Sequence, residues 1–320
     1  MSIRSVITAT GSYLPKKIVT NLELSKTVET SDEWIIERTG IKQRHIADES
    51  ELTSDIAAKA ALEALKNAKI NASEIDLIVL ATTTPDLTFP STATTVQNKI
   101  GAINAFAFDI QAVCSGFVYA LTTADSFIKS GQVKKALVIG SDILSRIVDW
   151  NDRNTCVLFG DGAGAVVVEA SLDQQRGIIS WDLHSDGSLN DILKTSGGPA
   201  SNQKSGFIEM AGKEVFKHAV EKMSNSVLSV LAKANLTTKD INLLVPHQAN
   251  ARILKSVASR LELNDDQVIV TVENHANTSA ASIPLALDLA NSQKRIKRGD
   301  VVVLEALGGG LTWGSIVLKW

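Results

Sequence analysis

One of the two cysteines in this 320-residue chain, Cys114, lies in the stretch DIQAVCSGFVY, between an apolar strand-like run and an apolar helix-like run. A thiol in the first turn of a helix lies at the positive end of the helix dipole, beside free backbone N–H groups, and this favours the nucleophilic thiolate. We therefore predict that Cys114 attacks an acyl carbon. Free cysteine is also among the most buried residue types, so packing is the alternative, and Cys156 in TCVLFG keeps that packing role.

Three further segments carry groups that would serve such a nucleophile. His247 in VPHQAN is able to donate a hydrogen bond or a proton, whereas Asn277 in NHANTS donates through its amide but cannot act as a base. This pair suits the stabilisation of an enolate. Gly308–Gly310 in GGGLTWG would let backbone N–H groups approach a developing oxyanion. The structural alternatives are a satisfied histidine, a helix cap and a tight turn.

Runs rich in Ile, Val and Leu indicate the strands that position these groups. They are too continuous for half-exposed strands and predict strands covered on both faces. The segments 54–70 and 213–236 have the apolar spacing of amphipathic helices. The sequence therefore predicts an α/β fold. The predicted strands are residues 75–83, 136–142, 165–170, 241–246 and 301–307.

The order of these elements repeats along the chain. IDLIVL at 75 and INLLVP at 241 lie 166 residues apart, and ALVIGS at 136 and VVVLEA at 301 lie 165 apart. We therefore predict two related halves, residues 1–172 and 173–320, although two α/β segments also resemble each other by composition alone.

The repeat also predicts where the polar groups lie. Asn277 follows Cys114 by 163 residues, close to the other offsets, so we expect the two residues to occupy corresponding positions. Strand ends that face a shared crevice are where open α/β sheets bind ligands. Cys114, His247 and Asn277 are therefore expected to converge.

Composition excludes several classes of function. Hydrophobic residues make up 44% of the chain and the formal net charge is -3, so no basic excess favours nucleic acid or a membrane as partner. No Cys/His cluster has metal-site spacing, and two cysteines make no disulfide framework. No apolar run has the length of a signal peptide or a membrane span. We expect a cytoplasmic protein without a metal, acting on a small or protein-borne ligand.

Several segments make a family resemblance visible. VCSGF, VPHQANARI and NHANTSAASIPLAL, in this order and spacing, closely resemble the active-site segments of the bacterial 3-oxoacyl-[acyl-carrier-protein] synthase III family, in the thiolase superfamily. TSDEWIIERTGIKQRHIA, NDRNTCVLFGDGAGAV and EALGGGLTWGS extend the resemblance over essentially the whole chain. The resemblance implies a thiolase-like fold with duplicated halves in a five-layer α/β/α/β/α arrangement, and a homodimer.

The resemblance implies an initiating condensing enzyme of type II fatty-acid synthesis. Cys114 matches the nucleophile that takes the acyl group from acetyl-CoA or another short acyl-CoA. His247 and Asn277 match the pair that promotes decarboxylation of malonyl-[acyl-carrier protein] and stabilises the carbanion that attacks the acyl-cysteine. The products of this ping-pong reaction are 3-oxoacyl-[acyl-carrier protein], CoA and CO2. No cofactor is implied, because the CoA thioester is a substrate.

Binding residues are implied in the same way. The backbone amides of Cys114 and Gly309 match the oxyanion hole, and Arg252 matches a basic residue that receives the acidic carrier protein. The matched substrate-binding residues are Trp34, Arg38, Phe89, Arg153 and Phe159.

Four of these five have a specific implied role. Trp34 and Arg153 match the pair that sandwiches the adenine of CoA, a physically sensible clamp for an aromatic base, and Arg38 contacts the same ligand. Phe89 matches a residue that reaches across the dimer to limit the neighbouring acyl pocket.

Two positions depart from the family pattern. Lys213 stands where an Asn usually touches the pantetheine arm, and Ala276 stands where Gly is common. These departures affect the expected pantetheine contacts and the local loop geometry.

Proteins of other classes share some of these features. Papain-like hydrolases share the chain order Cys, His, Asn, but here the cysteine follows a buried strand in mid-chain without a papain-type motif. A non-catalytic acyl-CoA-binding protein of this fold would lack one of the three residues. Thiolases use a second cysteine near the C-terminal Gly-rich turn, where this chain has Leu311 and Thr312. The nearest rival is a related acyltransferase or condensing enzyme of a specialised pathway with a different acceptor.

Overall fold

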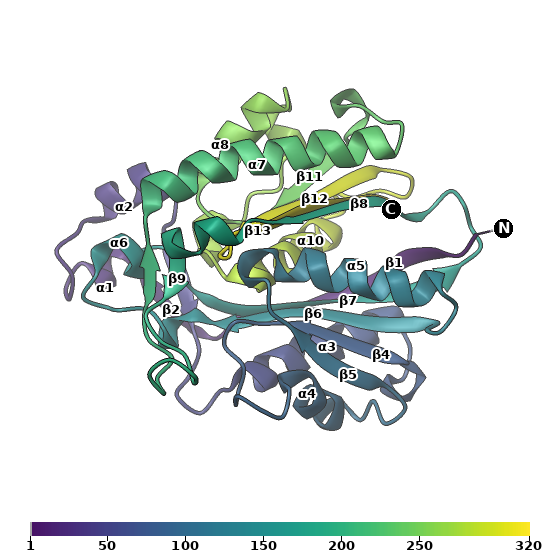
Figure 1. Ribbon diagram of the computed structural model, residues 1–320, viewed down its shortest axis with the longest axis horizontal. Helices are drawn as coiled ribbons and strands as arrows, with labels where there is room; N and C mark the ends of the chain where they lie inside the picture. The colour runs from purple at the N-terminus through teal and green to yellow at the C-terminus, as the bar shows by residue number, and fades with distance from the viewer. Residues whose placement is uncertain (1) are drawn as a thin grey trace.

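Two β-sheets and three layers of helices form the chain in the computed structural model, which describes residues 2–320 (Figure 1). The layer helices are α3 (Thr53–Ala68), α4 (Thr92–Ile100), α5 (Gly116–Lys129), α7 (Gly212–Lys233), α8 (Ala251–Arg260) and α10 (Ser282–Ser292). Helices α3 and α4 cover one sheet, α7 and α8 cover the other, and α5 and α10 lie between the two sheets. This is the predicted five-layer α/β/α/β/α order.

The first sheet is formed by the N-terminal part of the chain. Its strands are β1 (Arg4–Tyr13), β4 (Leu77–Ala81), β5 (Phe106–Ile110), β6 (Lys135–Ile143) and β7 (Asp161–Ser171), in the order β1-β7-β6-β4-β5. β4 runs parallel to β5 and β6, whereas β7 runs antiparallel to β1 and β6. Every residue of β4 is buried, as expected for a strand with helices on both faces.

The second sheet repeats this pattern. Its strands are β8 (Gly177–Ser185), β11 (Leu243–Pro246), β12 (Val301–Gly308) and β13 (Thr312–Lys319), in the order β11-β12-β13-β8. Again one outer pair, β11 and β12, is parallel and the others are antiparallel. A single parallel bridge between Leu244 and Val268 stands where β5 stands in the first sheet. The division expected after residue 172 falls in the connection between β7 and β8.

The central elements of the two halves correspond with one offset. β4 and β11 begin 166 residues apart, at 77 and 243, and α5 and α10 also begin 166 apart, at 116 and 282. Cys114 therefore corresponds to Ala280. Its predicted correspondence with Asn277 is wrong by three residues, because the loops before α5 and α10 share a backbone path but no sequence pattern that marks their register.

Smaller elements surround the ends of the sheets. They are β2 (Lys17–Thr20), β3 (Gln43–Ile46), β9 (Leu193–Thr195), β10 (Ile208–Met210), α1 (Asn21–Leu24), α2 (Asp32–Thr39), α6 (Arg153–Cys156) and α9 (Val272–His275). Two 3₁₀ turns, Val113–Ser115 and Ser279–Ala281, lead into α5 and α10. Both turns begin with a non-glycine residue of positive φ, 49° at Val113 and 50° at Ser279.

The halves touch backbone to backbone at the strand ends. A Cβ added to Gly140 of β6 would lie 2.2 Å from the carbonyl oxygen of Ala280 in the turn before α10. Real Cβ atoms do not approach an oxygen so closely, so this contact admits only glycine. Sheet one therefore abuts the turn that carries the second central helix.

We expect Gly140→Ala to lower the free energy of unfolding by roughly 1–3 kcal/mol, because the added methyl group forces the halves apart. Denaturant unfolding would measure the change. Gly187→Ala is the matched control, since a Cβ at Gly187 meets nothing within 4 Å. Equal free energies of unfolding for the two variants would show that the contact between β6 and Ala280 accommodates a methyl group without loss of stability.

Candidate active site

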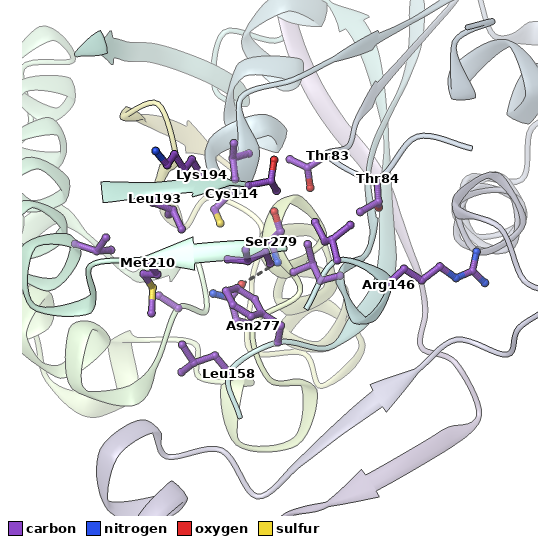
Figure 2. A pocket seen from close by; sticks show the side chains of 18 of the residues that line it. Thr83, Thr84, Cys114, Arg146, Leu158, Leu193, Lys194, Met210, Asn277 and Ser279 are labelled. Atoms are coloured by element: carbon purple, nitrogen blue, oxygen red, sulfur yellow. Dashed lines mark hydrogen bonds between the residues drawn. The ribbon is translucent and has the colours of Figure 1, made fainter. Parts of the chain in front are cut away.

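A cavity of about 1620 Å³ opens at the strand ends where the two halves meet. Cys114, His247 and Asn277 all line it, and Figure 2 shows Cys114 and Asn277 on its wall together with Ser279. Such a volume exceeds that of most small-molecule pockets, which suits a long ligand. The three predicted residues therefore share one cavity, with Cys114 from the first half and the other two from the second.

Cys114 lies in the 3₁₀ turn immediately before α5 and is 6% exposed. Burial raises the pKa of its thiol to about 12; the Ser279 hydroxyl opposes this rise and the charge of Asp142 adds to it. The thiol is therefore protonated at neutral pH. The sequence-based expectation of a resting thiolate is wrong, because burial outweighs the helix dipole that the prediction considered.

The backbone N–H of Cys114 is kept open by a glycine in the other half. A Cβ at Gly308, the last residue of β12, would lie 2.6 Å from Cys114 N. The position that corresponds to Gly308 in the first half, 166 residues earlier, is Asp142, and its carboxylate accepts the N–H of Ala280. One half thus caps this N–H with a side chain, whereas the other leaves it free for a ligand.

Gly309, the second expected oxyanion donor, is not among the residues that line the cavity. It packs against β9, where a Cβ added to Gly309 would lie 2.8 Å from the carbonyl oxygen of Leu193. Leu307, two residues earlier, lines the cavity.

His247 follows β11 directly and is 2% exposed. Its backbone N–H donates to the carbonyl of Glu305 at 2.7 Å, and its Nδ1 lies 2.7 Å from Ser282 Oγ at the start of α10. Burial lowers the pKa of the imidazole to about 3, so the ring is neutral. Ser282 Oγ also accepts the backbone N–H of Gln248, at 3.3 Å. When the Ser282 hydroxyl donates its hydrogen to Nδ1, the proton of the neutral ring is on Nε2.

Asn277 is fixed through its backbone and its side-chain oxygen. It forms a parallel bridge with Phe159: its N–H donates to Leu158 at 2.9 Å and its carbonyl accepts from Gly160 at 3.0 Å. Its Oδ1 accepts the backbone N–H of Ser279 at 2.9 Å, the dashed contact in Figure 2. Because the oxygen is identified by this donor, the Nδ2 group is left to donate hydrogen bonds elsewhere.

The residue before Asn277 shows the effect of the second departure. Ala276 has φ 58° and ψ -163°, a region that essentially only glycine adopts without strain. The loop therefore keeps a glycine-like backbone although the residue is alanine.

In the expected nucleotide clamp, both arginines contact the Trp34 ring directly. Trp34 and Arg38 line the cavity, and the guanidinium carbons of Arg38 and Arg153 lie 4.7 and 5.3 Å from the centroid of the Trp34 ring. Both distances are those of direct cation–π contacts. An adenine would therefore have to displace Arg153, whose guanidinium also donates to the carbonyl of Glu29.

The other predicted binding residues divide into two groups. Phe159 and Arg252 line the cavity, Arg252 with its guanidinium carbon 5.7 Å from the centroid of the Phe216 ring. Lys213, the first departure from the family pattern, also lines it. Phe89 does not line it: its side chain is 83% exposed, so it has no packing role within its own chain.

Sequence reasoning missed three polar residues around Cys114. Ser279 lines the cavity, Ser282 orients His247, and Asp142 lies buried behind the wall. The signal available for Asp142 was its position: a lone carboxylate at the end of the otherwise apolar run ALVIGSD. The two serines lie in NTSAAS, directly after Asn277.

The described residues offer neither a metal site nor a membrane-spanning helix. Within residues 2–320 no group of three or more His, Cys, Asp or Glu side chains could hold a metal ion. No helix in the described part of the chain is both long and apolar enough to cross a membrane.

Comparisons with known proteins converge on one family. The model for 3-oxoacyl-[acyl-carrier-protein] synthase III matches residues 108–187, and the model for its C-terminal part matches residues 231–320. The chain is 61% identical to a beta-ketoacyl-[acyl-carrier-protein] synthase III of Ehrlichia canis, with 99% of each chain covered, and 57% identical to one of Rhodospirillum centenum, with 100% of each covered.

A solved structure agrees. The crystal structure of 3-oxoacyl-[acyl-carrier-protein] synthase III from Aquifex aeolicus superposes with a TM-score of 0.95 at 49% identity, covering 99% of this chain and 100% of that one. With two family models and full-length relatives in agreement, the chain belongs to the 3-oxoacyl-[acyl-carrier-protein] synthase III family.

Proposed function

We propose that this chain condenses a short acyl-CoA, acetyl-CoA in the first instance, with malonyl-[acyl-carrier protein] and so starts fatty-acid chains. The observation that carries the proposal is the meeting of Cys114, His247 and Asn277 around one cavity, in a chain of this family. The products are 3-oxoacyl-[acyl-carrier protein], CoA and CO2. No cofactor enters the proposal, because the thioester substrate already holds an activated acyl group.

In the first half-reaction Cys114 takes the acyl group. Its sulfur attacks the thioester carbonyl, and the carbonyl oxygen becomes an oxyanion. The N–H of Cys114, which Gly308 leaves uncovered, is the donor we assign to that oxyanion. CoA leaves and vacates the cavity for the second substrate, which is the basis of the ping-pong order.

In the second half-reaction the malonyl group loses CO2. Negative charge moves from its carboxylate to the thioester oxygen of an enolate. His247, a neutral ring that donates from Nε2, and Asn277, whose Nδ2 is free, supply two neutral donors for that oxygen. The enolate carbon then attacks the acyl-cysteine.

The excess of basic residues along the cavity favours the binding of anionic ligands. Six basic residues line the cavity, against two acidic ones, Asp86 and Asp152. The basic residues are Arg38, Arg146, Lys194, Lys204, Lys213 and Arg252. We assign this excess to the phosphates of CoA and of the carrier-bound pantetheine, and the exposed Arg252 to the acidic carrier protein.

A homodimer is part of the proposal. β5 is the edge of the first sheet and pairs with one strand only among residues 2–320. Phe106 of β5 stacks near Phe108 and contacts Phe127 of α5 edge to face, and Phe106 is 47% exposed. An exposed apolar edge strand is a template for pairing with a second copy. A partner there would also give the exposed Phe89 a surface to enter.

A cytoplasmic location completes the proposal. Cys114 and Cys156 are both free thiols, the state that a reducing compartment maintains. A condensing enzyme of a specialised pathway is the remaining rival, since acyl-Cys114 chemistry would be the same with another acceptor.

Intact-protein mass spectrometry after incubation with acetyl-CoA should show one added acetyl group in the wild type and none in Cys114→Ala. Addition of malonyl-[acyl-carrier protein] should remove the acetyl group as acetoacetyl-[acyl-carrier protein] forms. Cys156→Ala is the matched control and should behave as the wild type, because Cys156 is buried away from the cavity. An acetyl group that is only hydrolysed, or that moves to another acceptor, would refute the initiating role.

The rate of malonyl-[acyl-carrier protein] decarboxylation by Cys114→Ala should stay nearly constant from about pH 8 to about pH 5. His247, with its pKa lowered to about 3 by burial, stays neutral throughout this interval, in which an ordinary histidine titrates. Measurement of CO2 release gives the profile. A change centred near 6.5 that disappears in His247→Gln would contradict a neutral donor.

Phe106→Lys should convert the dimer to a monomer, because a charge on the edge strand opposes pairing. Sedimentation equilibrium would report the mass. Leu172→Lys, at a site that is 61% exposed in the connection between β7 and β8, is the control and should remain dimeric. A dimeric Phe106→Lys would place the interface elsewhere.

A further inference from the structure

We infer that Ser279 and Asp142 form a proton relay behind Cys114, in which Asp142 holds the thiol proton while the acyl group occupies the sulfur. This inference rests on the proposed function. Neither residue has a part in the condensation steps above. Those steps do not say where the proton of the buried, neutral Cys114 thiol goes.

Ser279 is a neighbour of both the thiol and the carboxylate. It lines the cavity together with Cys114, and the residue that follows it, Ala280, donates its N–H to Asp142 Oδ2 at 3.2 Å. Its hydroxyl lowers the pKa of both groups. Ser279 is 1% exposed and lines the cavity beside Cys114 (Figure 2). Its Oγ has no fully formed hydrogen bond to any other residue of 2–320 at rest, so the contact with sulfur or with carboxylate is available to form as a proton moves.

Asp142 is buried with hydroxyl and amide partners but no cation. Oδ1 accepts the N–H of Thr83 at 2.7 Å and the hydroxyls of Thr82, Thr83 and Thr84 at 3.1, 2.9 and 3.2 Å. Within the described part of the chain, Oδ2 accepts only the N–H of Ala280, at 3.2 Å. None of its hydrogen-bond partners is a lysine or arginine, so burial dominates and raises the pKa of Asp142.

This shell suits a carboxyl group that changes its protonation state. A threonine hydroxyl donates to a carboxylate and accepts from a carboxylic acid after a simple rotation, which a lysine or arginine cannot do. Oδ2 has room for a proton, because it accepts one hydrogen bond and Oδ1 accepts four. Asp142 is itself not exposed to the cavity, so substrates do not reach it.

The charge balance favours this acceptor over solvent. If the thiol proton left for water, two buried anions, the thiolate and the Asp142 carboxylate, would lie together. If the proton moves to Asp142, the cluster keeps one negative charge, which only shifts from oxygen to sulfur. His247 is a poor acceptor, since its pKa lies far below that of the thiol, and Asn277 cannot accept a proton.

Acylation begins with transfer of the thiol proton. The S–H bond of Cys114 breaks, its proton passes to Ser279 Oγ, and the Ser279 proton passes to Asp142 Oδ2. The sulfur forms its bond to the acyl carbon, and CoA leaves with the electron pair of its carbon–sulfur bond. The released CoA thiolate, whose ordinary pKa is above 7, then takes one proton from water.

Condensation reverses the relay. The bond between the acyl carbon and Cys114 breaks, the sulfur keeps the electron pair, and the proton returns from Asp142 through Ser279. Until then Asp142 is neutral, so no buried anion opposes entry of the malonyl carboxylate. One negative charge enters with malonate and one remains on Asp142 after CO2 has left.

The relay predicts an unusual proton stoichiometry. Direct transfer of the thiol proton to CoA consumes no proton from solution during acylation, whereas the relay consumes about one per active site. Stopped-flow mixing with acetyl-CoA alone, in weakly buffered solution with a pH indicator near pH 7, measures this uptake. Cys114→Ala corrects for protons that binding alone displaces.

We expect uptake of about one proton per acyl-enzyme in the wild type, and none in Asp142→Asn or Ser279→Ala, each with acylation slowed roughly 100-fold. Asp161→Asn is the matched control: Asp161 is also fully buried with amide and hydroxyl partners, but it does not line the cavity and lies away from Cys114, so it should keep the uptake. Ser279→Ala keeps the test open if Asp142→Asn does not fold.

The outcomes separate the two proposals. A wild type that forms acyl-enzyme, as seen by intact mass, without taking up a proton refutes the relay and leaves the proposed function intact. Normal uptake and rate in Ser279→Ala also refute it. A wild type that forms no acyl-enzyme with any short acyl-CoA refutes the proposed function itself.

Discussion

The site depends on a reciprocal contact between the two halves. The end of β6 abuts the turn before α10 through Gly140 and Ala280, and the end of β12 abuts the turn before α5 through Gly308 and Cys114. Each sheet therefore holds the N-terminal end of the other half's central helix. Since neither contact tolerates a side chain, Cys114 and the residues around it are positioned by backbone rather than by flexible groups.

Duplication supplied two such turns, and four substitutions distinguish them. At positions related by the offset of 166, the first half has Ala81 and Gly116 where the second has His247 and Ser282, which contact each other. Conversely, Cys114 faces Gly308 where Ala280 faces Asp142. One turn thus presents the Cys114 thiol with an open N–H, and the other half supplies hydrogen-bond donors. The same backbone contact serves both, and the side chains decide the chemistry.

The parts of this arrangement that follow from local pattern were predictable. Apolar runs located β4, β6, β11 and β12 within a few residues, because strands buried on both faces leave a continuous signal. Residue type and position after a strand singled out Cys114 and His247. The register of the repeat at Asn277 was not predictable, because it depends on loop paths, and neither was the closed contact of Arg153 with Trp34, which depends on rotamers. The protonation state of Cys114 also required its burial, which only the packed structure provides.

Burial limits how much charge this site tolerates, and that limit explains why its donors are neutral. A lysine or arginine beside His247 would bind the malonyl carboxylate strongly and would have to release that interaction as CO2 departs. Only interactions that strengthen towards the transition state accelerate the step. A neutral imidazole and an amide interact weakly with the distant carboxylate and more strongly with the enolate oxygen as charge arrives there. The basic residues are accordingly at the mouth, where Lys213 and Arg252 are exposed, while the interior relies on oriented N–H groups.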